Sequence, residues 1–125
     1  FHEMTLAATL HKVKYGPRSM PAWTVLRLAT QRAAEALRLD HLIGTLEVGK
    51  QADIVVIRKN SVSLYPEADP ASQIVYGAHP NDVHHVFVQG EPRVLNGELV
   101  QEDLSDIIEK SNEAWKETSE RMKKD

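Results

Sequence analysis

The stretch from Gly44 to Ile57 (GTLEVGKQADIVVI) has a glycine and lysine spacing that could bind phosphate. A phosphate loop requires a glycine, four residues, a second glycine, a lysine and a serine or threonine that binds magnesium. Gly44, Gly49 and Lys50 match, but Gln51 stands where the hydroxyl is required. Such a loop also follows a strand and opens a helix, because loop amides and the helix N-terminus bind the anion together. Here a helical pattern precedes the glycines and a strand-like run follows, which disfavours nucleotide binding.

A second group of chemically capable side chains lies further along the chain and consists of His79, Asp82, His84 and His85. Imidazole and carboxylate groups are ordinary zinc ligands. Adjacent residues of a strand project from opposite faces of a sheet, so we expect that His84 and His85 do not bind one ion together. We interpret these histidines as surface or edge residues.

The other candidates also indicate structural roles. His2 and Glu3 begin the zinc-protease pattern H-E-x-x-H, but Leu6 occupies the place of the second histidine. Asp53 follows a glycine-lysine turn, where we expect it to cap the turn or pair with Lys50 rather than transfer protons. The sequence therefore predicts no catalytic residue and no metal ligand in this chain.

The elements that would position these residues are three helices around a β-rich middle. Apolar periodicity predicts one helix that ends at Gly16, a second that begins with Pro21 as its first residue and ends near Leu39, and a third in the tail. Residues 60–78 read as a long loop with a short helix near 72–75.

Three features define the β-rich middle. The run Ile54–Ile57 is entirely apolar and β-branched, which favours a strand covered on both faces. Residues 83–88 read as a second strand, and Asn96-Gly97 between apolar pairs predicts a type I′ hairpin. Pro92 lacks an N–H group, so we expect it at the first residue of a strand or on a sheet edge.

Residues 101–125 predict an amphipathic helix capped by Asp103, with basic residues at its end, including Lys124, that complement the helix dipole. The apolar positions recur at helical spacing. They form one stripe: Leu104, Ile107, Ile108, Ser111, Trp115, Thr118 and Met122. We predict that Leu104, Ile108 and Trp115 form an interface with the rest of the protein or with a second subunit.

Composition excludes several classes of function. The 125 residues include 15 basic and 18 acidic side chains, and the net charge of −3 gives no electrostatic footprint for nucleic acid. No apolar run approaches the roughly 20 residues of a membrane span. The chain has no cysteine, which removes disulfides, thiolate ligands and cysteine nucleophiles. We expect a cytoplasmic protein without nucleic-acid or membrane partners.

The central segment resembles the signature G-x-L-x-x-G-K-x-A-D of metal-dependent amidohydrolases. The residues that carry this motif are Gly44, Leu46, Gly49, Lys50, Ala52 and Asp53. The flanks are also similar to that family. Before the motif these residues are Ala29-Thr30, Ala33 to Leu39 (AAEALRL), Asp40 and Ile43, and after it VYGA at 75–78, DVHHVFVQG at 82–90 and NGEL at 96–99. The first helix, with Glu3-Met4 and Lys12, resembles the branch that deaminates or dechlorinates purine-like and triazine rings.

The resemblance implies an α/β fragment. Residues 1–40 would be the last helices of an amidohydrolase (β/α)8 barrel, residues 41–100 the C-terminal part of a small β-sandwich with the loop 60–78, and residues 101–125 a terminal helix. The zinc or iron ligands of the resembled enzymes would lie before Phe1, so no cofactor is expected in this chain.

The function implied is that of a C-terminal fragment of a metal-dependent hydrolase acting on amino- or chloro-substituted nitrogen heterocycles. The fragment would give structural support and would lack the catalytic centre. Its expected partner is the missing N-terminal barrel portion or another copy of the chain, in a homo-oligomer. The alternative is a freestanding, non-catalytic β-rich interaction module that self-associates.

Overall fold

The N-terminal half of the chain forms a small helical layer. In the computed structural model, which describes residues 1–123, α1 spans His2–Tyr15, α2 Ala22–Ala29 and α3 Gln31–Ala36. Helix α1 ends at Gly16 as the sequence predicted, and φ there is +90°, which favours glycine. Pro21 precedes α2 as its N-cap and is not its first helical residue.

The second predicted helix is in fact two helices, α2 and α3, separated at Thr30. The backbone of Thr30 leaves the helical region at φ −125° and ψ −91°, and its hydroxyl donates to the Leu26 carbonyl oxygen at 2.9 Å. A threonine hydroxyl that bonds back to the preceding turn competes with the helical backbone and bends the helix. The apolar periodicity of the sequence does not reveal this break.

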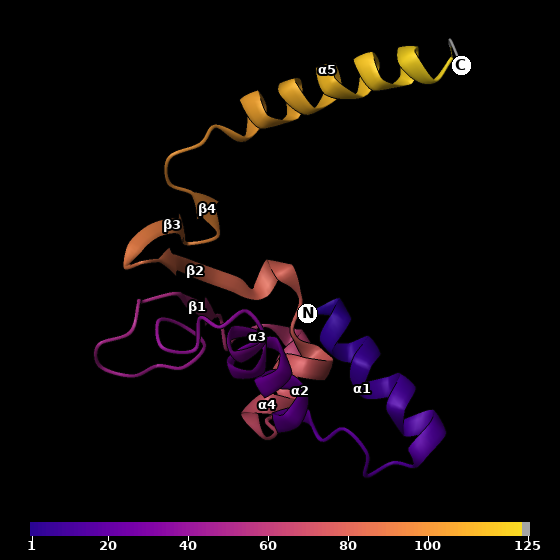
Figure 1. The fold of residues 1–125 in the computed structure, drawn as a ribbon, viewed down its shortest axis with the longest axis vertical. Helices are drawn as coiled ribbons and strands as arrows, with labels where there is room; N and C mark the ends of the chain where they lie inside the picture. Colours follow the sequence, from indigo (N-terminus) through magenta and orange to yellow (C-terminus); the bar gives the residue numbers. More distant parts are fainter. Residues whose placement is uncertain (124–125) are drawn as a thin grey trace.

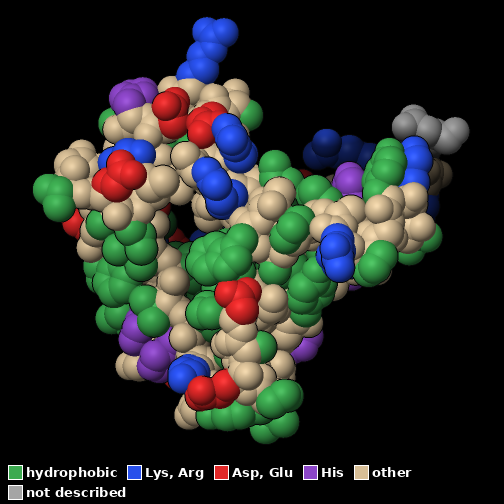
Figure 2. All heavy atoms as spheres, turned by 90° about the horizontal axis from the view of Figure 1, so that it is seen from below, with side chains coloured by type: hydrophobic (Ala, Val, Ile, Leu, Met, Phe, Trp, Pro, Cys, Tyr) green, Lys and Arg blue, Asp and Glu red, His purple; other side chains and the backbone are tan. Residues whose placement is uncertain are grey.

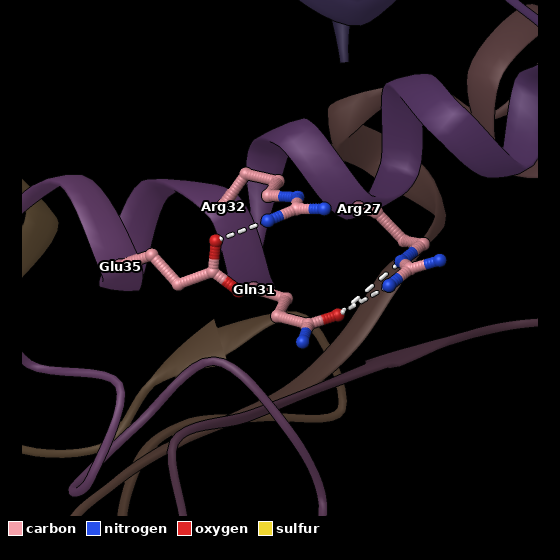
Figure 3. A network of polar contacts seen from close by, with 4 residues as sticks. All are labelled: Arg27, Gln31, Arg32 and Glu35. Atoms are coloured by element: carbon pink, nitrogen blue, oxygen red, sulfur yellow. Dashed lines mark hydrogen bonds and ion pairs between the residues drawn. The ribbon is translucent and has the colours of Figure 1, made fainter.

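One of the two exposed polar contacts in Figure 3 spans the break between α2 and α3, and the other lies within α3. Arg27 donates from Nε and Nη2 to Gln31 Oε1 at 3.2 and 3.0 Å, and Arg32 Nη1 lies 2.6 Å from Glu35 Oε2. Exposed pairs of this kind contribute less than about 1 kcal/mol each. The Arg27–Gln31 contact links α2 to α3 without adding much stability.

The core lies between α1, α2 and the segment after residue 70, where the predicted loop 60–78 contains three short helical elements. These are η1 (Val62–Leu64), α4 (Pro70–Ser72) and the π-helical turn η2 (Gln73–Gly77). Figure 1 shows α1, α2 and α4 side by side. The buried cluster consists of Ala8, Ala22, Val25, Ala71 and Val75.

Polar bonds supplement this small core. The Thr5 hydroxyl donates to the Val75 carbonyl oxygen at 2.6 Å, which joins α1 to the π-helical turn. Gly77 at the end of η2 lies against η1, because a Cβ atom there would stand 2.6 Å from the Ser63 carbonyl oxygen. The two segments therefore pack backbone to backbone.

The C-terminal half contains a four-stranded antiparallel sheet in the order β1-β2-β3-β4. The strands are β1 (Ile54–Ile57), β2 (Val83–Val88), β3 (Glu91–Leu95) and β4 (Glu98–Leu99). Asn96 and Gly97 join β3 to β4 with φ of +55° and +86°, which confirms the predicted type I′ turn. Pro92 is the second residue of β3, where β4 no longer pairs with that strand.

Strand β1 differs from its prediction. It lies at the sheet edge with β2 as its only partner in the described sheet, and Val55 and Val56 are 56% and 37% exposed. A strand covered on both faces needs a layer on each side, and residues 1–123 provide no such cover for these two side chains. The apolar run is present, but the described part of the chain leaves it open.

Helix α5 (Leu104–Met122) stands apart from the helical layer, beyond β4 (Figure 1). Asp103 caps it as predicted by accepting the Ser105 N–H at 2.8 Å, while Lys124 lies outside the described residues. None of its residues is buried, and Trp115 is 66% exposed. No helix among residues 1–123 combines the length and apolarity that a membrane crossing requires.

Candidate functional site

The glycine-lysine segment forms a tight loop packed against α3. Gly44 has φ +96°, and a Cβ atom on it would lie 2.7 Å from the Ala34 Cβ and 3.4 Å from the Thr30 carbonyl oxygen. Gly49 also has a positive φ, +95°, but nothing lies within 4 Å of its missing Cβ. The first glycine is required by close packing and by conformation, and the second by conformation alone.

The charge of Lys50 is directed into its own turn. Its Nζ donates to Thr45 Oγ1 at 2.6 Å and lies 3.4 Å from Glu47 Oε2, and the side chain is only 17% exposed. The following amide, that of Gln51, donates to the Leu42 carbonyl oxygen at 2.8 Å. A phosphate loop needs its lysine and amides free to face an anion. This geometry therefore agrees with the sequence argument against nucleotide binding.

Asp53 joins the same segment to the turn between β2 and β3. Its Oδ1 accepts the Gln89 N–H at 2.8 Å, and the Ala52 carbonyl oxygen accepts the Gly90 N–H at 3.0 Å. Lys50 pairs with Glu47 and not with Asp53. The carboxylate thus holds a turn 36 residues away in sequence. The motif fastens α3, its own loop and the β2–β3 hairpin together.

Asp82 is the one charged residue that is buried among those described, with 6% exposure. Its Oδ2 accepts the His79 N–H at 2.7 Å and the Ser63 hydroxyl at 3.1 Å, and the Ser63 hydroxyl also lies 2.8 Å from that of Ser61. Hydrogen bonding from Ser61 and then from the His79 backbone lowers the pKa of Asp82. His79 reaches Asp82 through its backbone, so no serine-histidine-aspartate relay exists here.

The two adjacent histidines of β2 lie together, which corrects the prediction that they project from opposite faces. Val56 pairs with His85 and Ile57 with Val83, so His84 is the extra residue of a β-bulge. The imidazole centroids are 4.1 Å apart. The strict alternation of side chains holds only for a regular strand, and the bulge interrupts it.

The bulged pair does not form a metal centre. No group of three or more His, Cys, Asp or Glu side chains within residues 1–123 could hold a metal ion. Arg58 Nη2 lies 3.3 Å from His84 Nδ1, where its positive charge opposes a cation. The structure thus defines an α/β unit whose polar side chains hold its own turns.

Sequence reasoning found the motif residues but not the residues they bind. Gln89 and Gly90 form a second turn with positive φ values of +54° and +82°, and Arg58 reaches across the sheet to His84. The glycine at 90 after an apolar run was the available signal for the turn. Nothing local to Arg58 indicates its partner.

Comparison with known proteins identifies the family. Residues 1–93 match the model of the amidohydrolase family, and the chain belongs to that family. It is 45% identical over 112 residues to 5′-deoxyadenosine deaminase of Methanopyrus kandleri, covering 89% of this chain and 26% of that protein. It is 37% identical over 122 residues to 5-methylthioadenosine/S-adenosylhomocysteine deaminase of Halalkalibacterium halodurans, covering 97% and 28%.

Two solved structures agree with the branch that the first helix predicted. A zinc-bound adenosine deaminase from Xanthomonas campestris matches 94% of this chain and 27% of its own, with a TM-score of 0.88 and 32% identity. A zinc complex of atrazine chlorohydrolase from Arthrobacter aurescens matches 88% and 25%, with a TM-score of 0.79 and 30% identity. The chain spans about a quarter of the length of these relatives.

The two motif glycines give the first test. We expect Gly44→Ala to lower the free energy of unfolding by about 3 kcal/mol, because a left-handed alanine is strained and its Cβ overlaps Ala34. Gly49→Ala is the matched control and should cost about 1 kcal/mol from conformation alone. Urea unfolding followed by circular dichroism measures both. Equal losses would show that Gly44 is not held against α3.

Asp82 gives a test with pH. Because the pKa of Asp82 is lowered below its ordinary 3.8, its contribution is complete above pH 3.8 and is lost as the pH falls through the folded-state pKa. We expect Asp82→Asn to be less stable than wild type by about 1 to 3 kcal/mol at pH 7. This difference should shrink toward pH 3 in urea unfolding.

The control for this pH test is Glu102→Gln, which changes an exposed acid at the end of the hairpin segment. Its unfolding free energy should follow that of wild type at each pH. A difference between Asp82→Asn and wild type that stays constant from pH 7 to pH 3 would contradict the role assigned to the carboxylate.

Proposed function

We propose that this chain is the C-terminal, supporting part of a metal-dependent amidohydrolase that acts on amino- or chloro-substituted nitrogen heterocycles in the cytoplasm. The relatives with the matching segment are adenosine-type deaminases and a triazine chlorohydrolase, each about four times as long as the matched segment. The polar residues of the described chain hold its own loops. Substrate and metal would therefore be bound by residues of the remaining parent protein.

The observation that carries this proposal is the exposed area. The chain exposes 9742 Å², whereas a compact monomer of 14.1 kDa exposes about 6,700 Å². The excess of about 3,000 Å² is the size of an obligate interface between folded units. Figure 2 shows apolar side chains gathered in broad patches on one face of the molecule. Such a surface requires cover.

The exposed elements suggest which surfaces the rest of the parent protein would contact. In the proposed arrangement residues 1–40 are the last barrel helices, residues 41–100 a portion of a β-sandwich, and residues 101–125 the terminal helix. The free edge of β1 and the exposed Val55 and Val56 support strand pairing and stacking from the parent chain. An apolar edge strand without charge or proline is otherwise prone to aggregation.

Zinc is present in both solved structures named above, and the same kind of metal is proposed for the parent enzyme. Residues 1–123 of this chain do not fit it. The described donors form no set of three, and the adjacent histidines face the Arg58 guanidinium. Metal binding is therefore assigned to the parent's other residues. Iron, which the resemblance also allowed, has no support from the matched structures named above.

Helix α5 is proposed as the subunit contact. Its apolar stripe, with Leu104, Ile108 and Trp115, is exposed along the whole helix. A large aromatic residue flanked by aliphatic side chains is typical of an interface centre. The proposed partner is another copy of the chain, so the same surface also supports the alternative of a self-associating module.

A chimera tests the proposed function. The 125 residues would replace the corresponding quarter of the Methanopyrus kandleri deaminase, with which 45% of the aligned residues are shared. We expect the chimera to bind zinc and to deaminate 5′-deoxyadenosine, while the same enzyme without this quarter is insoluble or inactive. Zinc content and ammonia release are the measurements. A folded, zinc-loaded chimera without activity would contradict the supporting role, and so would a compact, monomeric isolated chain that binds no hydrophobic dye.

The stripe on α5 is tested by Ile108→Asp with Trp115→Asp. We expect the double variant to lose self-association in analytical ultracentrifugation, because both changes place charge in the centre of the apolar stripe. The control is Lys110→Ser with Glu117→Ser, two exposed charged residues of the same helix, which should leave the association unchanged. Association that survives the double aspartate change would assign the subunit contact to another surface.

A further inference from the structure

The β-bulge in β2 brings two imidazoles into contact with the turn between β3 and β4. His85 Nδ1 accepts the Asn96 N–H at 3.2 Å, and the His84 carbonyl oxygen accepts the Gly97 N–H at 2.9 Å. The turn is thus fastened to β2 by two hydrogen bonds, and one of them ends on an imidazole. Because a backbone N–H can only donate, the Nδ1 atom of His85 must carry no proton.

The second imidazole is held in the same protonation state. Arg58 Nη2 lies 3.3 Å from His84 Nδ1, and a guanidinium group can only donate. The hydrogen bonds therefore fix both rings as neutral imidazoles with their protons on Nε2. Partial burial, and then electrostatic interaction with His85 and Arg58, lower the pKa of His84.

The groups around the two imidazoles disfavour the protonation of either ring. Arg58, which follows β1, is the charged side chain that faces the pair, and the β3–β4 turn contributes backbone groups from Asn96 and Gly97. Within β2, the His85 ring has the uncharged Phe87 ring as a neighbour at 6.3 Å. A proton on either ring would place a donor against a donor and a charge beside another imidazole 4.1 Å away.

We propose that His84 and His85 form a pH-sensitive latch that holds the β3–β4 hairpin closed when both imidazoles are neutral and releases it when they are protonated. For His84, whose pKa is lowered, the release falls below the ordinary imidazole value. Folding then favours the neutral His84 ring, so the contribution of that ring to stability is complete above the ordinary imidazole pKa and is lost as the pH falls. The released turn lies at the start of β4, which leads through residues 100–103 to α5.

Amide hydrogen exchange of the full chain tests the latch. We expect the protection factor of the Asn96 amide to fall about fivefold between pH 7.5 and 5, the equivalent of one ordinary hydrogen bond. The Gly90 amide is the internal control, because it bonds to the Ala52 carbonyl oxygen in a comparable turn without an imidazole. Its protection factor should stay constant. Nuclear magnetic resonance resolves both amides and the two imidazole titrations in one sample.

Two variants separate the latch from general acid sensitivity. His85→Gln supplies an amide oxygen that accepts a hydrogen bond but does not titrate, so Asn96 protection should become independent of pH. His11→Gln changes an exposed histidine of α1 and should keep the wild-type response. Where the His85→Gln variant leaves the Asn96 amide unprotected at pH 7.5, the test rests on the wild-type protein. In the wild type, the pH midpoint at which Asn96 loses protection must equal the midpoint of the His84 or His85 titration.

The latch is overturned by either of two results. One is an Asn96 protection factor in the wild type that is the same at pH 7.5 and pH 5. The other is a loss of Asn96 protection that does not follow the histidines. Its pH midpoint would differ from both imidazole titrations, or the loss would occur unchanged in a His85→Gln variant whose Asn96 amide is protected at pH 7.5. Neither result depends on whether the parent protein is a hydrolase.

Discussion

A shortage of buried apolar surface is the constraint on which the rest of this structure depends. The core cluster consists of alanines and valines, and its largest fully buried side chains are Val25 and Val75. Burial of a single valine contributes only about 1.5 to 3 kcal/mol. Specific polar contacts therefore hold the elements in place, as in the bond from Thr5 to the Val75 carbonyl oxygen and in the contacts of Lys12 with the carbonyls of residues 19 and 20.

The parts of the fold that rest on local stereochemistry were predictable from sequence. A type I′ turn needs positive φ values at both central residues, and few residue pairs other than Asn-Gly adopt them readily. The hairpin could therefore be predicted from Asn96 and Gly97 alone. Gly16 and Asp103 likewise mark helix ends through backbone and side-chain preferences that act within a few residues. The family also followed from the central motif, because its residues lie in one continuous segment.

The parts that depend on distant partners were not predictable. The break at Thr30 and the bulge at His84 arise from hydrogen bonds and strand register, which no local periodicity encodes. Asp53 and Asp82 illustrate the same limit within the candidate site. Each carboxylate binds a backbone N–H that the sequence does not indicate, at positions 89 and 79.

The close approach of Gly77 to the Ser63 carbonyl oxygen has a consequence for the evolution of this family segment. A methyl group on residue 77 would lie 2.6 Å from that oxygen. Real Cβ atoms do not approach an oxygen so closely, so an alanine requires a different path for the backbone around residue 63. Residue 77 and the η1 segment must then change together. Among homologues, a substitution at one of these positions should be accompanied by a compensating change at the other, and each would be harmful alone.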